Sequence, residues 1–326
     1  MRVLVIGGAG YIGSHVCKEL KKAGHTAIVV DNLSTGHRES VEDFEFHECD
    51  ITNREALGCV FHDVEPDAVI HMAAKIVVSD SVKYPNNYYH NNVTGMINVL
   101  KWCAFFNVKH FVFSSTAAVY QPSEMRITED DPLIPMNPYG RSKLMCESMM
   151  ADLARSESWF NATSLRYFNV AGAEADGSIG QSFPTSTHLI KIAVEAAAGK
   201  RDGVQIYGED YATVDGTAVR DYVHVSDSAH AHVLALEEQI NSSHQILKAY
   251  NVGTGEGYSV KQILNTVRQV TGVDFPVEIA PRRQGDPAVL VADSRKIQLE
   301  LHWQPLRSNL VNLINTAYSW ELNKRY

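Results

Sequence analysis

A strand, a glycine-rich turn and a helix follow one another at the N-terminus, and this order constrains the fold more than any other feature of the sequence. The apolar run 2–6 leads into Gly7, Gly10 and Gly13, and a helical pattern covers residues 14–22. Glycines at this spacing allow a tight turn, close approach of the backbone to a pyrophosphate, and close packing of helix on strand. The helix N-terminus then faces the phosphates. The sequence therefore predicts a dinucleotide site at the first strand–helix connection.

Asp31 ends the second predicted strand, residues 27–30, and follows Gly10 by about 20 residues. A carboxylate at this position accepts hydrogen bonds from the adenosine ribose of a dinucleotide and repels a 2′-phosphate. The pattern therefore favours NAD over NADP. The plainer alternative is a solvated carboxylate at the end of a strand.

Strand and helix patterns alternate about six times over the first 170 residues. Further strands are expected at 44–47, 67–72, 109–114 and 162–168, and helices at 53–62, 88–106 and from 138 onward. This alternation predicts an α/β fold with a Rossmann-type, doubly wound parallel sheet that binds ligands at the carboxyl ends of its strands. Longer polar loops follow. We expect an NAD-binding Rossmann domain, mainly residues 1–170, and a smaller C-terminal α/β substrate-binding lobe, residues 171–326, interleaved with segments that return to the first domain.

Tyr139 and Lys143 lie four residues apart in a helical pattern, so both side chains project from one face of the helix. Tyrosine titrates near pH ~10, and a phenolate at neutral pH needs about 4 kcal/mol of stabilisation, which an adjacent ammonium and a cofactor charge can supply. Ser114 and Thr116 follow a predicted strand at the ligand-binding edge, so their hydroxyls are candidate substrate contacts. Neither feature alone identifies a site, because Tyr-x-x-x-Lys is common by chance and Ser and Thr cap many turns.

The composition excludes several classes of protein. The 326 residues carry a formal net charge of −9, and no basic run is present that would follow a nucleic-acid backbone. No apolar stretch reaches the ~18 residues of a membrane span, and the first residues do not resemble a signal peptide. The 5 cysteines lack CxxC spacing. Scattered cysteines of this kind are typical of reduced thiols in the cytoplasm, and we expect this protein there. Among the 14 histidines, His230 and His232 would point to different faces of a helix, and no metal site is predicted.

Several motifs occur together in one order along the chain. They are Gly7-x-x-Gly10-x-x-Gly13, Asp31-Asn32-Leu33, Tyr88-Tyr89 with Asn91-Asn92-Val93, the Ser/Thr element ending in Thr116, Tyr139-x-x-x-Lys143, Arg166 to Asn169, Arg220 to Val225, and Ala280 to Asp286. Together they resemble the extended short-chain dehydrogenase/reductases. Over essentially the whole chain, they more closely resemble the UDP-glucose (UDP-galactose) 4-epimerase family.

This resemblance implies an NAD-dependent isomerase that oxidises C4 of UDP-galactose or UDP-glucose to a 4-keto sugar and re-reduces it on the opposite face. Tyr139 would take the proton from the 4-hydroxyl, Lys143 would hold the nicotinamide ribose and depress the pKa of Tyr139, and Thr116 would hydrogen-bond the same oxygen. The cofactor contacts it implies are Gly7, Gly10, Tyr11, Ile12, Gly13, Asp31, Asn32, Asp50, Ile51, Met72, Ala73, Ala74, Asn91, Ser114, Tyr139, Lys143 and Tyr167. The substrate contacts it implies are Thr116, Tyr139, Asn169, His188, Arg220, Arg283 and Asp286.

Some residues depart from the family pattern and leave the identity of the sugar substrate undecided. His188 stands where some relatives have asparagine, and Lys191 stands where proline is frequent. Leu290 occupies a position where an aromatic residue restricts the pocket and a small residue admits N-acetyl sugars, so an epimerase acting also or mainly on UDP-N-acetylhexosamines or UDP-uronic acids is an open alternative. Related 4,6-dehydratases place an Asp-Glu pair after the threonine, whereas Ala117-Ala118 stand here and argue against that activity.

A non-catalytic NAD-binding regulator is an alternative from another class, because fold does not determine function. Such proteins tend to lose the catalytic set, which is intact here. The resemblance also implies a homodimer formed through the helix at 88–106 and the helix that carries Tyr139. The expected partners are therefore a UDP-sugar and a second copy of the chain, with neither nucleic acid nor membrane.

Overall fold

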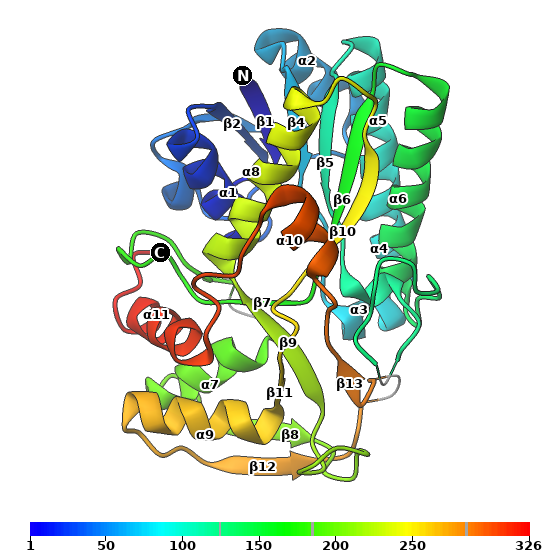
Figure 1. The fold of residues 1–326 in the computed structure, drawn as a ribbon. Coiled ribbons are helices and arrows are strands. Elements are labelled where there is room, and N and C mark those ends of the chain that lie inside the picture. The colour runs from blue at the N-terminus through cyan, green and yellow to red at the C-terminus, as the bar shows by residue number, and fades with distance from the viewer. Residues whose placement is uncertain (124, 184–185, 284–285) are drawn as a thin grey trace. The chain divides into compact units, whose positions relative to one another are not determined.

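Two compact units make up the structure, a computed structural model that describes residues 1–123, 125–183, 186–283 and 286–326 (Figure 1). The first unit consists of Met1–Gln121, Pro132–Arg166 and Ala229–Tyr250. The second unit consists of Pro122–Asp131, Tyr167–Ser228 and Asn251–Tyr326. Each unit is therefore assembled from three separate stretches of chain.

A seven-stranded sheet of order β10-β6-β5-β4-β1-β2-β3 organises the first unit. Its strands are β1 (Arg2–Ile6), β2 (Thr26–Asp31), β3 (Glu45–Glu48), β4 (Ala68–His71), β5 (His110–Ser114), β6 (Asn161–Tyr167) and β10 (Leu247–Val252). Every pairing from β3 to β6 along this order is parallel. The strand order reverses direction between β1 and β4, and such a switch point is where open α/β sheets bind ligands. The predicted doubly wound parallel sheet is confirmed.

Helices cover both faces of this sheet. They are α1 (Tyr11–Lys22), α2 (Arg54–Val64), α3 (Val78–Lys83), α4 (Pro85–Tyr88), α5 (Gly95–Phe105), α6 (Pro138–Ser156) and most of α8 (Val225–Asn241), with short 3-10 turns η1 (Arg38–Val41) and η3 (Ala117–Val119). One face packs α2, α5 and α6 against the sheet through buried side chains such as Phe61, Met96 and Met150. Figure 1 shows α5 and α6 next to each other on that face. Asn53 and Asn137 start α2 and α6 by accepting backbone hydrogen bonds from the first turn.

The segment predicted as one helix over residues 88–106 is divided in the structure. A π-helical stretch, η2 (Tyr89–Thr94), separates α4 from α5. This wider turn contains Asn92, whose side chain is fully engaged with Lys75 and Ser142. The predicted helical segment is thus confirmed, but its π-helical turn was not predicted, because periodicity barely distinguishes one extra residue in a turn from an ordinary α-helix. Such π-bulges often occur at functional sites.

The second unit is built around β9 (Val219–His224), which pairs in parallel with β7 (Asn169–Ala171) and β13 (Val289–Leu290) and antiparallel with β11 (Gly257–Ser259). A parallel pair, β8 (Val204–Tyr207) and β12 (Val277–Ala280), forms a second small sheet. The helices are α7 (Leu189–Ala197), α9 (Val260–Thr271), α10 (Arg295–Leu301) and α11 (Leu310–Leu322). A capping box of Ser259 and Gln262 starts α9, and Gly272 ends it at φ 69°.

The apolar faces of α7, α9 and α11 form the core of the second unit. Across the described stretches of chain, no helix is both long enough and apolar enough to cross a membrane.

One buried ion pair links α6 to β6 inside the first unit. The Arg166 guanidinium donates to both carboxylate oxygens of Glu147, at distances from 2.7 to 3.2 Å. Their side chains are only 6% and 8% exposed. Arg166 also donates to the Tyr120 hydroxyl at 2.9 Å. Removing one partner of such a pair leaves a buried charge without compensation, which is costly.

We predict that Glu147→Gln lowers the free energy of unfolding by about 3–5 kcal/mol, because Arg166 loses its counter-charge. The matched control is Asp152→Asn on the same helix, which breaks an exposed pair with Arg155 (3.0 Å) and should cost less than ~1 kcal/mol. Urea denaturation of both variants measures the difference. Equal losses would show that the buried pair has no special weight in stability.

Candidate active site

The glycine turn after β1 is shaped by the close approach of two strand ends. Gly7 has φ +84°, and a Cβ built on it would lie 2.5 Å from the Ala73 nitrogen. A Cβ on Gly13 would lie 2.2 Å from the Gly7 oxygen. By contrast, a Cβ on Gly10 would meet only the Gly7 oxygen, at 3.3 Å. Gly7 and Gly13 are therefore required for packing, whereas Gly10 keeps the approach to the helix N-terminus unobstructed.

The N-terminus of α1 is suited to an anion. Its N-cap residue, Gly10, provides no side-chain cap, and no acidic residue lies in the first turn. Tyr11 and Ile12 are the first two residues of the helix, and backbone amides at this position point outward from the positive end of the helix dipole. These features fit the pyrophosphate of a dinucleotide.

Acidic groups gather at the ends of β2 and β3. The Asp31 carboxylate accepts hydrogen bonds from the Ala9 amide (3.0 Å) and the Leu33 amide (2.9 Å). Burial raises the pKa of Asp31, against the opposing effect of these backbone donors. The Asn32 amide donates to Asp50 at 2.8 Å, which brings two carboxylates and an amide to one edge of the sheet. Two carboxylates repel a 2′-phosphate, so the arrangement fits NAD.

The segment after β4 closes against the end of β1. The amides of Met72 and Ala73 both donate to the Ile6 carbonyl, at 2.7 and 2.9 Å. Asn91 lies in the π-helical turn and donates to the Asn92 carboxamide at 3.0 Å. Asn92 in turn holds the backbone of Lys75 through the two hydrogen bonds of 2.8 and 3.1 Å. No role was predicted for Asn92, although its position beside Asn91 and after Tyr88-Tyr89 was a usable signal.

The predicted catalytic residues converge at the carboxyl edge of the same sheet. Thr116 follows β5 and caps η3 by accepting from the Ala118 amide at 3.1 Å. It lies close enough to Tyr139, near the start of α6, to lower the pKa of the phenol. One turn later, the Lys143 ammonium donates to the Ser114 carbonyl at 2.7 Å and lies 4.7 Å from the centre of the Phe113 ring. Thr116, Tyr139 and Lys143 are all buried.

The pKa values of Tyr139 and Lys143 differ from those of the free side chains. Burial raises the pKa of Tyr139 to about 12, and the hydrogen bond with Thr116 only partly opposes this. The Lys143 ammonium group is directed to the Ser114 carbonyl. The role of Lys143 in depressing the pKa of Tyr139 stays a prediction. A phenolate at neutral pH requires further positive charge beside the ring.

Glu147 supports the charge of Lys143 and was not predicted as a site residue. Burial lowers the pKa of Lys143 to about 8, while Cys146 and Glu147 oppose this shift. Glu147 also accepts a short hydrogen bond from Ser115, the residue before Thr116. Its position four residues after Lys143 on a helix could have indicated a role.

In the second unit, Arg220 and Asp286 form an ion pair. Arg220 also donates to the carbonyls of Val219 (2.7 Å) and Pro287 (2.8 Å). The Arg283 guanidinium lies 3.8 Å from the centre of the Tyr207 ring, a cation–π contact. Arg220 and Asp286, two of the predicted substrate residues, are thus in direct contact. Arginine and aromatic side chains of this kind are suited to binding nucleotides.

The remaining predicted substrate residues also lie in the second unit. Asn169 begins β7, opposite Tyr222 of β9, and His188 is the N-cap residue of α7. Leu290 is paired with Arg220 in the register of β13 and β9. Tyr167, the last residue of β6, belongs to the second unit as well. Within the residues that the structure describes, no three His, Cys, Asp or Glu side chains are grouped to hold a metal ion.

Comparisons with known proteins agree with this geometry. The model of the NAD dependent epimerase/dehydratase family matches residues 3–253. A UDP-glucose 4-epimerase from Lactobacillus helveticus is 47% identical over 322 residues, which cover 98% of this chain and 97% of the relative. The structure is similar to UDP-glucose 4-epimerase from Brucella ovis in complex with NAD, with a TM-score of 0.94, 42% identity and 98% coverage of both chains.

A second solved structure carries a broader name. The UDP-Glc/GlcNAc 4-epimerase from Campylobacter jejuni is 43% identical, with a TM-score of 0.86 and 99% coverage of both chains. The resemblance stated from the sequence motifs is confirmed by these matches. The chain belongs to the NAD dependent epimerase/dehydratase family, and its similarity over the full length groups it there with the UDP-glucose 4-epimerases.

Proposed function

We propose that this protein interconverts UDP-galactose and UDP-glucose as an NAD-dependent 4-epimerase. The observation that carries this proposal is the buried set of Thr116, Tyr139 and Lys143 at the carboxyl edge of a dinucleotide-type sheet. The full-length similarity to enzymes named UDP-glucose 4-epimerase supports the same reaction. Since the sugar is oxidised and then reduced again at C4, no net redox change occurs and one cofactor molecule serves every turnover.

The first unit fits NAD. The glycine turn and the uncapped start of α1 suit the pyrophosphate, and Asp31 with Asn32 suits the adenosine ribose. When bound, NAD supplies the acceptor and donor of the C4 hydride and, in its oxidised form, a positive charge near the tyrosine. The residues that we propose to hold it are Gly7, Gly10, Tyr11, Ile12, Gly13, Asp31, Asn32, Asp50, Ile51, Met72, Ala73, Ala74, Asn91, Ser114, Tyr139, Lys143 and Tyr167.

Tyr139 moves the proton in this proposal. Its hydroxyl lies close to that of Thr116, so both groups can contact the same sugar oxygen. With a pKa raised to about 12 by burial, Tyr139 is protonated in the absence of further positive charge. It can therefore accept the 4-hydroxyl proton only when its pKa falls, and afterwards it returns the proton to the same oxygen. Lys143 is held in place by Ser114 and keeps an ammonium donor close to the reaction.

The second unit supplies the UDP-sugar contacts in this proposal. We assign the diphosphate to Arg220 and Arg283, because guanidinium groups suit phosphate oxygens, and the uridine ribose to Asp286. Asn169 and His188 are the remaining proposed contacts. Leu290 lies next to Arg220 in the sheet and has an intermediate size, so UDP-N-acetylhexosamines are the second candidate substrates. The similarity to a UDP-Glc/GlcNAc 4-epimerase favours that candidate over UDP-uronic acids.

We also propose a homodimer in the cytoplasm. The helices α5 and α6 expose apolar side chains, among them Ile97 (51% exposed), Phe105 (68%) and Met145 (46%). Large exposed apolar groups on neighbouring helices are typical of protein interfaces. The free cysteines fit a reducing compartment.

The function is tested directly by incubating the purified protein with UDP-galactose and no added NAD. We expect UDP-glucose to form and NAD to be released on denaturation, because the cofactor is regenerated in each turnover. Bound NAD with no conversion of UDP-galactose, but with conversion of a UDP-N-acetylhexosamine or UDP-glucuronate, would transfer the proposal to that sugar. Bound NAD with no conversion of any of them would favour the non-catalytic regulator.

Tyr139→Phe should reduce turnover by about 10²–10⁴-fold, since general acid–base catalysis by the phenol is lost. The NAD content should stay unchanged. It is measured as the absorbance of the supernatant after the protein has been denatured. The control is Tyr250→Phe, which removes another buried hydroxyl of the first unit, one that contacts Glu238 at 3.1 Å, and should leave turnover within about two-fold of wild type. Substantial activity of Tyr139→Phe would refute the assignment of the base.

We predict that sedimentation at micromolar concentration gives the mass of a dimer. Replacing Phe105, on the exposed side of α5, by aspartate should shift the protein toward monomer, because a charge would then be buried in the interface. Leu306→Asp, at a residue with 77% exposure in the second unit, is the matched control. A monomeric wild type would contradict the dimer.

A further inference from the structure

His188 is held in one chemical form by its neighbour. The Gln181 side-chain amide donates to His188 Nδ1 at 2.9 Å. An amide NH₂ group can only donate, so Nδ1 accepts and the ring proton resides on Nε2. Burial lowers the pKa of His188, which keeps the ring neutral. The imidazole therefore presents a single N–H donor at Nε2, and its direction depends on Gln181.

Gln181 is itself anchored by Trp320 near the end of α11. The indole Nε1 donates to the backbone carbonyl of Gln181 at 3.1 Å. The same Gln181 amide that contacts His188 also donates to Ser186 at 3.0 Å. A Cβ on Gly180 would lie 2.4 Å from the indole ring, so the ring rests flat against the backbone just before Gln181. Trp320 is buried, and it leaves Gln181 little freedom to shift.

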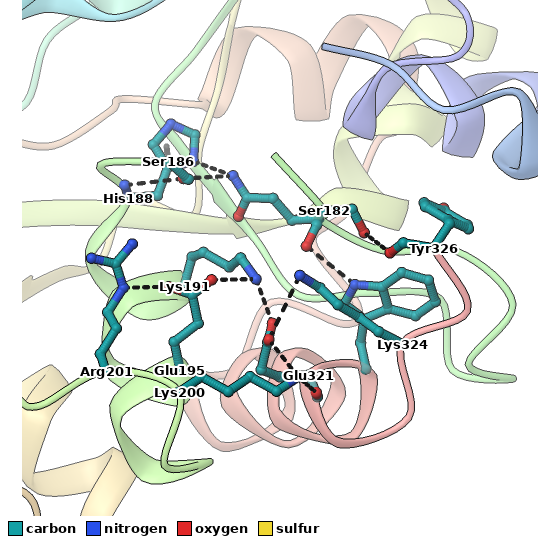
Figure 2. A network of polar contacts seen from close by, with 12 residues as sticks. Ser182, Ser186, His188, Lys191, Glu195, Lys200, Arg201, Glu321, Lys324 and Tyr326 are labelled. Atoms are coloured by element: carbon teal, nitrogen blue, oxygen red, sulfur yellow. Dashed lines mark hydrogen bonds and ion pairs between the residues drawn. The ribbon is translucent and has the colours of Figure 1, made fainter. Parts of the chain in front are cut away.

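The last residue of the chain completes this contact. The Tyr326 ring lies 5.1 Å from that of Trp320, centre to centre. Ser182, directly after Gln181, donates to the Tyr326 carbonyl at 3.0 Å. Figure 2 shows Ser182 next to Tyr326. Residues more than 130 positions apart in sequence are thus joined within the second unit.

A second link runs from the residue after Trp320 to the first turn of α7. Glu321 forms a short ion pair with Lys191, three residues after His188, and a further pair with Lys200 at 3.0 Å. Lys191 also pairs with Glu195 at 2.9 Å. The side chains of Lys191 and Glu321 are only 3% and 1% exposed. Figure 2 shows them pointing toward each other. Although burial opposes the charge on Lys191, Glu321 and Glu195 raise its pKa, so the pair is ionised and directional.

We propose that Trp320 and Glu321 are positioning residues that hold the His188 imidazole for binding of the UDP-sugar. Trp320 acts through Gln181 on the Nδ1 side of the ring, and Glu321 acts through Lys191 on the helix that begins after His188. This inference rests on the proposed role of His188 in contacting the substrate. It also accounts for the burial of Lys191, because the charge of Lys191 is matched by Glu321.

The test compares two tryptophan-to-phenylalanine variants of the second unit. Trp320→Phe removes the hydrogen bond to Gln181, and it should raise the Kd for UDP and the KM for UDP-galactose by about two- to ten-fold, the loss expected for one hydrogen bond. Both kcat and NAD content should stay near wild type. Trp303→Phe is the control, because its buried indole also donates to a carbonyl, that of Asp227 at 2.9 Å. It should lower thermal stability without changing the Kd for UDP.

A double-mutant cycle with His188→Ala separates positioning from general stability. If Trp320 acts through His188, Trp320→Phe should have no further effect on UDP affinity in the His188→Ala background. Equal effects in both backgrounds, or an unchanged Kd for either single variant, would overturn the proposal. If Trp320→Phe does not fold, Gln181→Met takes its place in the cycle, because it removes the donor to His188 Nδ1. The expected result is the same. Absence of UDP-galactose turnover in the wild type would exclude that sugar as the substrate but leave these affinity comparisons valid.

Discussion

The close approach of the strand ends at the switch point is the constraint on which the rest of the first unit depends. The Ile6 carbonyl accepts hydrogen bonds from the amides of both Met72 and Ala73, which draws the end of β4 against the glycine turn. Only a residue without a Cβ fits at Gly7 and Gly13. This packing places the uncapped start of α1 at the carboxyl edge of the sheet, where ligands of such sheets bind.

The proposed catalytic set depends on the same sheet but is held by polar contacts. Lys143 is directed to Ser114, and Glu147 connects Ser115 to the buried Arg166. These contacts fix the lysine and threonine relative to the strands. They leave the pKa of Tyr139 raised, because burial of Tyr139 outweighs the opposing effect of Thr116. Coupling proton transfer to the charge of a bound cofactor is consistent with a site that reacts only when it is loaded.

In the second unit, charge and aromatic contacts have a comparable role. Arg220 and Asp286 are paired with each other, and Arg283 lies over the Tyr207 ring, so these groups are ordered by contacts within the unit. Binding energy for a nucleotide is larger when such side chains do not have to be immobilised on association. The contacts of α11 with Gln181 and Lys191 apply the same principle to His188.

Local sequence patterns determined much of this protein. The glycine spacing, the alternation of strands and helices, and the Tyr139–Lys143 spacing on a helix were sufficient to predict the sheet and the family, because each depends on a short stretch of chain. Only tertiary structure decided the π-helical turn at Asn92, the pKa of Tyr139, and the pairings of Glu147 with Arg166 and of Lys191 with Glu321. Each of these depends on burial or on contacts between residues distant in sequence, and neither burial nor such contacts can be derived from local periodicity.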